Sequence, residues 1–206
     1  VGRAARTQTP VFAGAMKTVV FAPYWNVPRS IAIGEILPKL HRGLGYLARE
    51  NMEIVRDGQP LATSADAVAQ LAAGTARLRQ RPGQGNSLGR VKFLFPNSNN
   101  VYLHDTPSRS LFQRSRRDFS HGCIRVADPV ALAPWVLAAE GWDAERVAAG
   151  LALESETRVP LTDAIPVVIY YTTAVARRDG TVAFYDDIYG HDAALRRALL
   201  ARRAGS

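Results

Sequence analysis

The chain contains a single cysteine, Cys123, among its 206 residues. No disulfide can form within the chain, so the fold has to be stabilised by a hydrophobic core. Apolar residues make up 47% of the sequence and charged residues 21%, which is typical of globular domains and excludes disordered and fibrous classes. At this length the sequence predicts one domain with room for an insertion. A zinc site built from several cysteines and a redox cysteine pair are also excluded.

The chain is basic: 26 lysines and arginines against 18 acidic residues give a net charge of +8. A basic surface suits nucleic acid, an anionic membrane or an acidic polymer such as cell wall. The arginine groups are not accompanied by an RNP-like motif, zinc-finger spacing or a helix-turn-helix signature, so we expect solvated faces and no nucleic-acid partner. No apolar run approaches the roughly 20 residues that span a bilayer, and we find no signal-peptide segment.

Apolar runs and turn residues predict short strands mixed with a few helices, an α+β domain that is mainly β. Residues 1–15 lack periodicity and are expected to form a flexible lead-in. The expected strands are residues 16–22, 52–55, 88–95, 101–104 and 124–126, and a hairpin of 166–176 and 181–185. The expected helices are residues 30–37, 64–73, 128–138 and 143–153, and the chain from 192 onward, with N-caps including Ser64 and Asp128.

The pattern of apolar and turn-forming residues changes between residues 37 and 84. Gly43 and Gly45 interrupt the chain there, and a short strand and an alanine-rich helix follow. About forty residues bury only a marginal core on their own. This stretch is therefore interpreted as an insertion in the domain.

Two segments carry the residues best suited to chemistry. The first begins His104-Asp105-Thr106-Pro107, and the second is Ser120-His121-Gly122-Cys123-Ile124-Arg125-Val126. Acyl transfer by a cysteine requires a thiolate, a nearby base and donors for the developing oxyanion. Cys123 offers the thiol, His104 at a predicted strand end offers the base, and the amides around Gly122 offer the donors. The loop between the two segments is long enough to bring them together.

Spacing alone leaves other interpretations open. Cys123 could be a small buried hydrophobe beside two incidental histidines. A metal site of His104, His121 and Cys123 is a second alternative, but no fourth ligand is evident and Asp105 is a weak one. The Ser120 hydroxyl is better suited to hydrogen bonding than to nucleophilic attack beside a thiol. We expect no metal and no cofactor.

The segment SHGCIRV with its upstream histidine resembles the signature of the L,D-transpeptidases, the YkuD-type catalytic domain of bacterial cell-wall enzymes. The similarity extends over about residues 16–190, and it is closest to the large YcbB-like proteobacterial branch. It is carried by the segments PYWNVP (23–28), ILPKL (36–40), GYLARENMEIV (45–55), PGQGNSLGRVKFLFPN (82–97), YLHDTPSRSLF (102–112) and DDIYG (186–190). The resemblance implies a β-sandwich-type catalytic domain at 16–206 with flanking helices, a capping subdomain at about 37–84, and a linker remnant at 1–15.

The resemblance also implies roles for individual residues. Cys123 is the implied nucleophile and His104 its general base, oriented by the backbone of Asp105. His121 and Gly122 are implied to shape the oxyanion site. Substrate-binding roles are implied for the side chains of Arg125, which would meet a carboxylate, and of Tyr102, Trp25, Ser120, Asn97 and Arg109.

The activity implied is peptidoglycan L,D-transpeptidation. Cysteine acyl transfer from a tetrapeptide stem releases D-alanine, and the thioester passes to a diaminopimelate amine of another stem. The implied partners are peptidoglycan stem peptides and other cell-wall synthases, and the implied inhibitors are carbapenems. The implied location is the periplasm, with a membrane link only through a missing N-terminal segment. Two alternatives stay open: a murein amidase or carboxypeptidase with the same Cys/His site, and a non-catalytic wall-binding module with a buried thiol.

Overall fold

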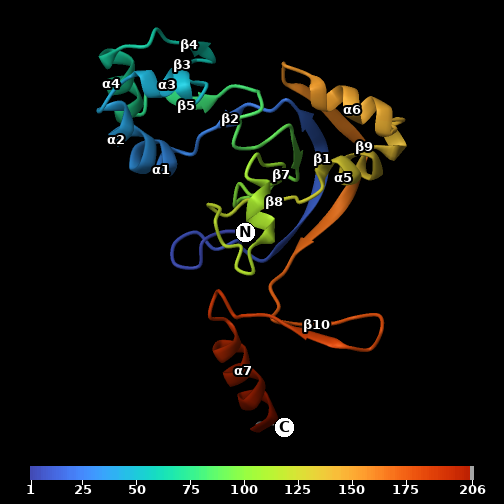
Figure 1. Ribbon diagram of the computed structural model, residues 1–206. Helices are drawn as coiled ribbons and strands as arrows, with labels where there is room; N and C mark the ends of the chain where they lie inside the picture. Colours follow the sequence, from blue (N-terminus) through green and yellow to red (C-terminus); the bar gives the residue numbers. More distant parts are fainter. Residues whose placement is uncertain (205–206) are drawn as a thin grey trace.

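The computed structural model describes residues 1–204 and is built around a five-stranded sheet in the order β8-β7-β6-β1-β9 (Figure 1). The long strand β1 (Phe12–Phe21) pairs antiparallel with β6 (Val91–Leu94) on one side and with β9 (Thr157–Ile169) on the other. On the far side of β6, the short strand β7 (Leu103–His104) pairs antiparallel with β6 and parallel with β8 (Ile124–Arg125). This parallel edge brings two segments that are distant in sequence side by side.

Helices cover one face of this main sheet. α5 (Pro129–Val136) and α6 (Ala144–Ala152) are joined by a 3-10 turn, η3 (Ala138–Glu140). Their apolar sides share one core with the sheet, whose buried members include Val19, Phe21, Val91, Phe93, Ala133, Val136, Leu137 and Val147. The α+β class is confirmed. A sandwich would have a second sheet packed on the main sheet, whereas here helices form the covering layer.

A second sheet, in the order β2-β5-β3-β4, belongs to the insertion. Its strands are β2 (Trp25–Asn26), β3 (Met52–Arg56), β4 (Gln59–Pro60) and β5 (Arg77–Gln80). The helical segments around it are α1 (Arg29–Ile31), η1 (Ala32–Ile36), α2 (Leu37–Leu40), α3 (Gly45–Arg49) and α4 (Ala65–Ala73). These elements bury a core of their own that contains Val27, Ile36, Leu40, Leu47, Ile54, Val68, Leu71 and Leu78.

The second sheet and its helical segments span residues 25–80, and the insertion is expected at about residues 37–84. Trp25 and Asn26 pair with β5 rather than with the main sheet. Pro38 lies in the first turn of α2, where its missing N–H is harmless. Ser64 caps α4 as predicted, because its side chain accepts a hydrogen bond from the Ala67 N–H.

The first nine residues fold against the loop that precedes Cys123. Gly2 bridges to Ser120, and the Arg3 N–H donates to the Ser120 carbonyl over 3.0 Å. The Thr9 hydroxyl donates to the Gly122 carbonyl over 2.8 Å. These contacts replace the expected flexible lead-in. Because most of them use backbone groups, side-chain periodicity gives no signal for them.

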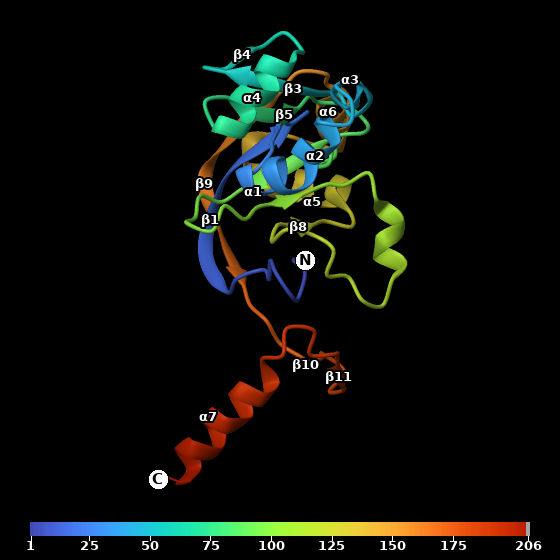
Figure 2. The same cartoon turned by 90° about the vertical axis from the view of Figure 1, so that its left-hand side faces the viewer.

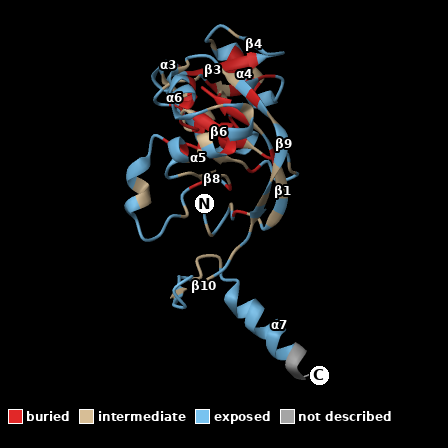
Figure 3. Ribbon diagram, turned by 90° about the vertical axis from the view of Figure 1, so that its right-hand side faces the viewer, coloured by how far each residue is buried: buried red, intermediate tan, exposed pale blue. Residues whose placement is uncertain are grey.

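The C-terminal part leaves the main body after β9. The predicted strand at residues 166–176 is divided: residues 166–169 belong to β9, and β10 (Ala174–Ala176) forms the predicted hairpin with β11 (Val182–Phe184). α7 (Asp192–Ala204) projects away from the body, and the hairpin and α7 are mostly exposed (Figures 2 and 3). The predicted final helix is thus confirmed, while residues 205–206 lie outside the described chain. Across the described residues, no helix is long and apolar enough to cross a membrane.

Candidate active site

A cavity of about 740 Å³ lies between the insertion and the β7–β8 edge of the main sheet. Its size suits a small molecule or a short peptide. The insertion contributes Trp25, Arg29, Ile31 and Glu35 to its wall. Most of the predicted site residues line it: Trp25, Tyr102, His104, Ser120, His121, Cys123 and Arg125.

The β7–β8 edge explains why these residues meet. His104 lies opposite Arg125 in the parallel register, and Cys123 immediately precedes β8. Chain segments that are nearly twenty positions apart therefore end at the same wall of the cavity. The prediction that the loop brings the cysteine segment back beside the histidine segment is confirmed by the pairing of β7 with β8.

The imidazole of His104 is buried, with 4% of its surface exposed. Its Nδ1 lies within hydrogen-bond distance of the Asp105 carbonyl oxygen. A carbonyl oxygen only accepts, so Nδ1 carries the proton and Nε2 keeps a free lone pair. Burial lowers the pKa of His104 to about 4, while the hydrogen bond to Asp105 acts in the opposite direction. The ring is therefore neutral at pH 7 and able to accept a proton.

The thiol of Cys123 is half-buried at the cavity wall. Burial raises the pKa of Cys123, and hydrogen bonds from Tyr102 act in the opposite direction. In the described part of the chain, the sulfur donates to the Asn100 carbonyl over 3.8 Å rather than to His104. At rest the site thus holds a protonated thiol and a neutral imidazole, and the thiol needs a base before it can attack.

Hydrogen bonds fix the loop that carries the thiol. The Ser120 hydroxyl donates to the Cys123 carbonyl over 2.6 Å and accepts from the Gly122 N–H over 3.2 Å. Gly122 has a φ of +116°, a conformation that side chains rarely adopt. The Ser120 hydroxyl therefore acts within the loop, as a hydrogen-bonding partner, even though the residue lines the cavity.

His121 connects this loop to the insertion. Its Nε2 lies 2.7 Å from an oxygen of Glu35, and Arg3 lies 3.6 Å from the same oxygen. The hydrogen bond with His121 lowers the pKa of Glu35, and the positive charges of Arg3 and Lys39 also lower it. Sequence reasoning missed Glu35, because nothing in its spacing marks one glutamate in a mainly apolar helix as a site residue.

Arg125 brings a positive charge to the cavity. Its Nε is buried and has no hydrogen-bond partner among the described residues. Burial lowers the pKa of this guanidinium, and the charge of Arg3 lowers it further. A buried N–H donor without a partner costs free energy, so this group is suited to an anionic ligand.

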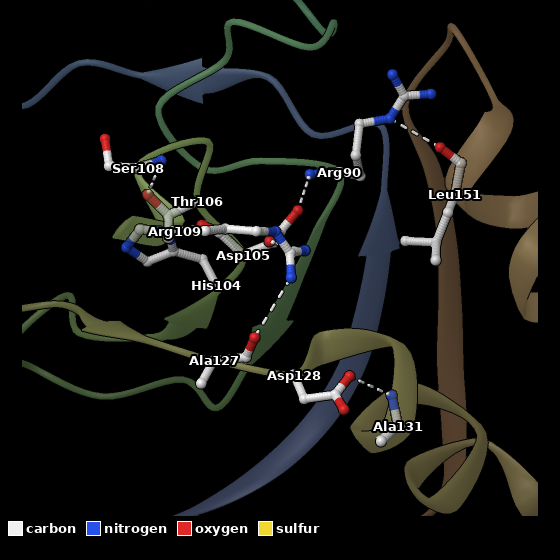
Figure 4. Close-up of polar contacts among 10 residues, drawn as sticks. All are labelled: Arg90, His104, Asp105, Thr106, Ser108, Arg109, Ala127, Asp128, Ala131 and Leu151. Atoms are coloured by element: carbon white, nitrogen blue, oxygen red, sulfur yellow. Dashed lines mark hydrogen bonds and ion pairs between the residues drawn. The ribbon is translucent and has the colours of Figure 1, made fainter. Parts of the chain in front are cut away.

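Two predicted substrate-binding residues lie elsewhere. The Asn97 amide donates to the carbonyls of Phe95 and Val101, over 2.6 and 2.7 Å, and so stabilises its own turn. Arg109 pairs with Asp105 at 3.0 Å (Figure 4). Neither side chain is among the described residues that line the cavity, and each has its hydrogen-bond or ion-pair partners within the protein. Substrate contacts of Asn97 and Arg109 stay predictions.

Within residues 1–204, no group of three or more His, Cys, Asp or Glu side chains is arranged to hold a metal ion. The described cavity instead gathers a thiol, a neutral imidazole and a guanidinium. This combination is typical of the active sites of thiol-dependent enzymes.

Comparison with known proteins identifies the family. A family model described as the YkuD L,D-transpeptidase catalytic domain matches residues 1–169. The chain is also 34% identical, over 186 residues, to a Haemophilus influenzae protein named "Putative L,D-transpeptidase". The chain belongs to the YkuD family of L,D-transpeptidase catalytic domains. The alignment covers 90% of this chain but 38% of the relative, so the chain spans well under half the length of that protein.

Proposed function

We propose that this domain is a peptidoglycan L,D-transpeptidase that uses Cys123 as its nucleophile. The observation that carries the proposal is the placement of Cys123 and His104 on one cavity wall, with His104 neutral and its Nδ1 held by the Asp105 carbonyl. That arrangement leaves Nε2 as the basic nitrogen. Family membership supports the same activity.

In the first half-reaction, His104 Nε2 accepts the thiol proton as the Cys123 sulfur attacks the substrate carbonyl. The carbonyl is the one that joins the L-centre of diaminopimelate to the terminal D-alanine of a tetrapeptide stem. The carbon–nitrogen bond then breaks, and the imidazolium returns the proton to the departing D-alanine amine. A thioester to Cys123 remains. Because the resting thiol is protonated, the sulfur becomes nucleophilic only as His104 takes its proton.

In the second half-reaction, the side-chain amine of a diaminopimelate on another stem attacks the thioester. The carbon–sulfur bond breaks, and the amine proton returns through His104 to the sulfur. The product is a direct diaminopimelate-to-diaminopimelate crosslink. The cycle needs no cofactor, and the site it uses would act in the periplasm, where stem peptides and other cell-wall synthases would be its partners.

The remaining cavity residues have supporting roles in this scheme. The guanidinium of Arg125, whose buried Nε has no hydrogen-bond partner among the described residues, would bind a stem carboxylate, and Trp25 and Tyr102 would line the groove. His121 and Gly122 would shape the oxyanion site beside Cys123. The insertion covers the cavity from the other side, which limits water and favours an amine acceptor over hydrolysis.

Incubation of the purified domain with a disaccharide tetrapeptide, followed by mass spectrometry of the products, tests the proposal. We expect crosslinked dimers and free D-alanine, and neither with C123A. The matched control is F184S, since Phe184 is 80% exposed on the hairpin beyond the family match, and it should retain activity. Truncated monomers without dimers would instead indicate a carboxypeptidase, and unchanged substrate would indicate a non-catalytic module.

A further inference from the structure

The carboxylate of Asp105 is buried and anchored on both oxygens. It accepts a hydrogen bond from the Arg90 backbone N–H over 2.9 Å and pairs with the Arg109 guanidinium over 3.0 Å (Figure 4). Only 6% of the Asp105 side chain is exposed. A carboxylate buried to this degree is stable only when it is paired and hydrogen-bonded. The arrangement therefore depends on both donors.

The chain before β6 leaves no room for this carboxylate to move. Gly89 has a φ of +65°, and a Cβ built on it would lie 2.3 Å from an Asp105 carboxylate oxygen. The backbone thus passes so close to the carboxylate that only glycine fits. Close backbone approach of this kind is a common reason for glycine at a fixed position.

The partners of Asp105 are themselves tied to other parts of the domain. Arg109 opens the 3-10 helix η2 (Arg109–Gln113), and a second nitrogen of its guanidinium donates to the Ala127 carbonyl, just after β8, over 3.4 Å. The Arg90 side chain donates to the Leu151 carbonyl of α6 over 2.7 Å. Asp105 therefore connects the loop after β7 with β8 and with the helical layer.

The anchored side chain determines where the Asp105 carbonyl points. The Asp105 N–H donates to the Val91 carbonyl over 2.9 Å, so the residue is held at its backbone nitrogen as well as at its carboxylate. Its carbonyl oxygen accepts from His104 Nδ1. Loss of the side-chain anchor would free this carbonyl to rotate away from the imidazole.

We propose that Arg109 is a positioning residue, which through its ion pair with Asp105 holds the Asp105 carbonyl against His104 Nδ1 and so keeps Nε2 as the proton-accepting nitrogen. This role deepens the proposed function and rests on it for its catalytic meaning. Arg109 does not line the cavity, so it acts on the site through the groups it contacts, the Asp105 carboxylate above all.

Other charged and titratable groups also face His104. Arg125 on β8 and the Val1 amine oppose a positive charge on the ring, and the Asp105 carboxylate favours one. The Tyr102 ring lies 5.8 Å away, between centroids. Lys92 is the register partner of His104 on β6, but its ammonium is directed to the Tyr24 carbonyl. Among these groups, only the Asp105 carboxylate is a direct partner of the Arg109 side chain.

The test is the tautomer of His104, read by ring nitrogen chemical shifts in ¹⁵N-histidine-labelled protein. Wild type should show a single Nδ1–H tautomer at pH 7. We expect R109A to give a mixture of tautomers and R109K to restore the single one. R116A is the matched control, because Arg116 forms an exposed ion pair with Asp118 at 2.7 Å, and it should leave His104 unchanged.

Kinetics give the second readout. R109A should lower kcat for transpeptidation by about 10-fold to 100-fold with KM within about twofold, since a displaced base affects the chemical step. R109K should recover most of the loss. If R109A fails to fold, R109Q serves the same purpose, because Arg109 is half exposed and glutamine is easily accommodated there.

A single Nδ1–H tautomer in folded R109A or R109Q would overturn the proposal, and so would a kcat loss that R109K does not repair. The tautomer measurement requires no turnover. It therefore decides the role of Arg109 even if the wild-type protein proves inactive on stem peptides, an outcome that would overturn the proposed function alone.

Discussion

Substitution of Gly89 by alanine should destabilise the protein far more than the same substitution at a comparable turn glycine. Gly89 and Gly58 both have positive φ values, +65° and +81°. A Cβ at Gly58 would meet nothing within 4 Å, whereas a Cβ at Gly89 would lie 2.3 Å from an Asp105 carboxylate oxygen. Comparing the unfolding free energies of G89A and G58A thus separates the backbone cost of a positive φ from the cost of displacing Asp105.

The backbone cost is common to both variants and amounts to about 1–2 kcal/mol for a non-glycine residue in the left-handed region. Only G89A must also move the Asp105 carboxylate away from the Arg90 N–H. Leaving a buried donor or acceptor unsatisfied costs about 1–3 kcal/mol. We therefore expect a loss of unfolding free energy of about 1–2 kcal/mol for G58A and about 2–5 kcal/mol for G89A.

Urea unfolding followed by circular dichroism measures both losses, and the slopes should be equal if both variants unfold in two states. G89A should also lose most of its transpeptidation activity, because the carboxylate that anchors the Asp105 carbonyl is displaced. Equal losses in G89A and G58A, within about 0.5 kcal/mol, would refute the reasoning that Asp105 is held in place by close contact with Gly89.

Three further predictions follow from the titrating groups of the site. Burial raises the pKa of Cys123, so its alkylation by iodoacetamide should accelerate as pH rises above about 8 and show no plateau between pH 5 and 7. Intact-protein mass spectrometry follows the reaction, and a plateau would indicate a preformed thiolate. Burial lowers the pKa of His104, the proposed base, to about 4, so the acid limb of kcat/KM should lie near pH 4, with activity present above it and lost as pH falls through it. An acid limb near pH 6.5 would contradict this effect of burial. The pKa of Glu35 is lowered in the folded state, so its contribution is present above the unfolded pKa and disappears as the pH falls through the folded one. Because Glu35 is half exposed, E35Q should lose less than about 1 kcal/mol at pH 7 relative to the control E50Q, measured by urea unfolding, with a smaller difference at pH 3. A difference unaffected by pH would exclude a stabilising hydrogen bond from His121 to the Glu35 carboxylate.

Local signals in the sequence predict several elements well. Ser64 and Asp128 cap their helices as expected, each accepting a hydrogen bond from the backbone N–H three residues on. The Asp179-Gly180 turn forms its hairpin, and the segment after residue 192 is helical. In each case the interaction lies within a few residues, so it can be recognised without knowledge of the tertiary structure.

Long-range packing accounts for most of the differences. β9 begins at Thr157, although Pro160 and Pro166 argue against a strand, because β9 lies at the edge of the sheet, where a proline removes no essential hydrogen bond. The inclusion of Trp25 and Asn26 in the second sheet depends on pairing with β5, more than fifty residues away. Periodicity does not report pairings over such separations.

The candidate site likewise contains features that the sequence predicts and features that depend on the three-dimensional arrangement. The sequence motif identifies Cys123 and His104, and the structure places both at one cavity. The family resemblance also implied a substrate-binding role for Arg109. Its partner in the structure, the Asp105 carboxylate, lies four residues away in sequence, a separation expected for pairs on a helix face but not for a loop. Only the three-dimensional arrangement shows this contact.

The central claim is that Cys123 holds the acyl group as a thioester, and intact-protein mass spectrometry during the reaction with a tetrapeptide donor tests it most directly. With a donor whose diaminopimelate side-chain amine is acetylated, so that no acceptor amine is present, we predict an adduct equal in mass to that donor minus D-alanine, mapped by peptide analysis to Cys123 and released by hydroxylamine. Release of D-alanine without such an adduct at any time point, or an equal rate of release from C123A, would contradict it.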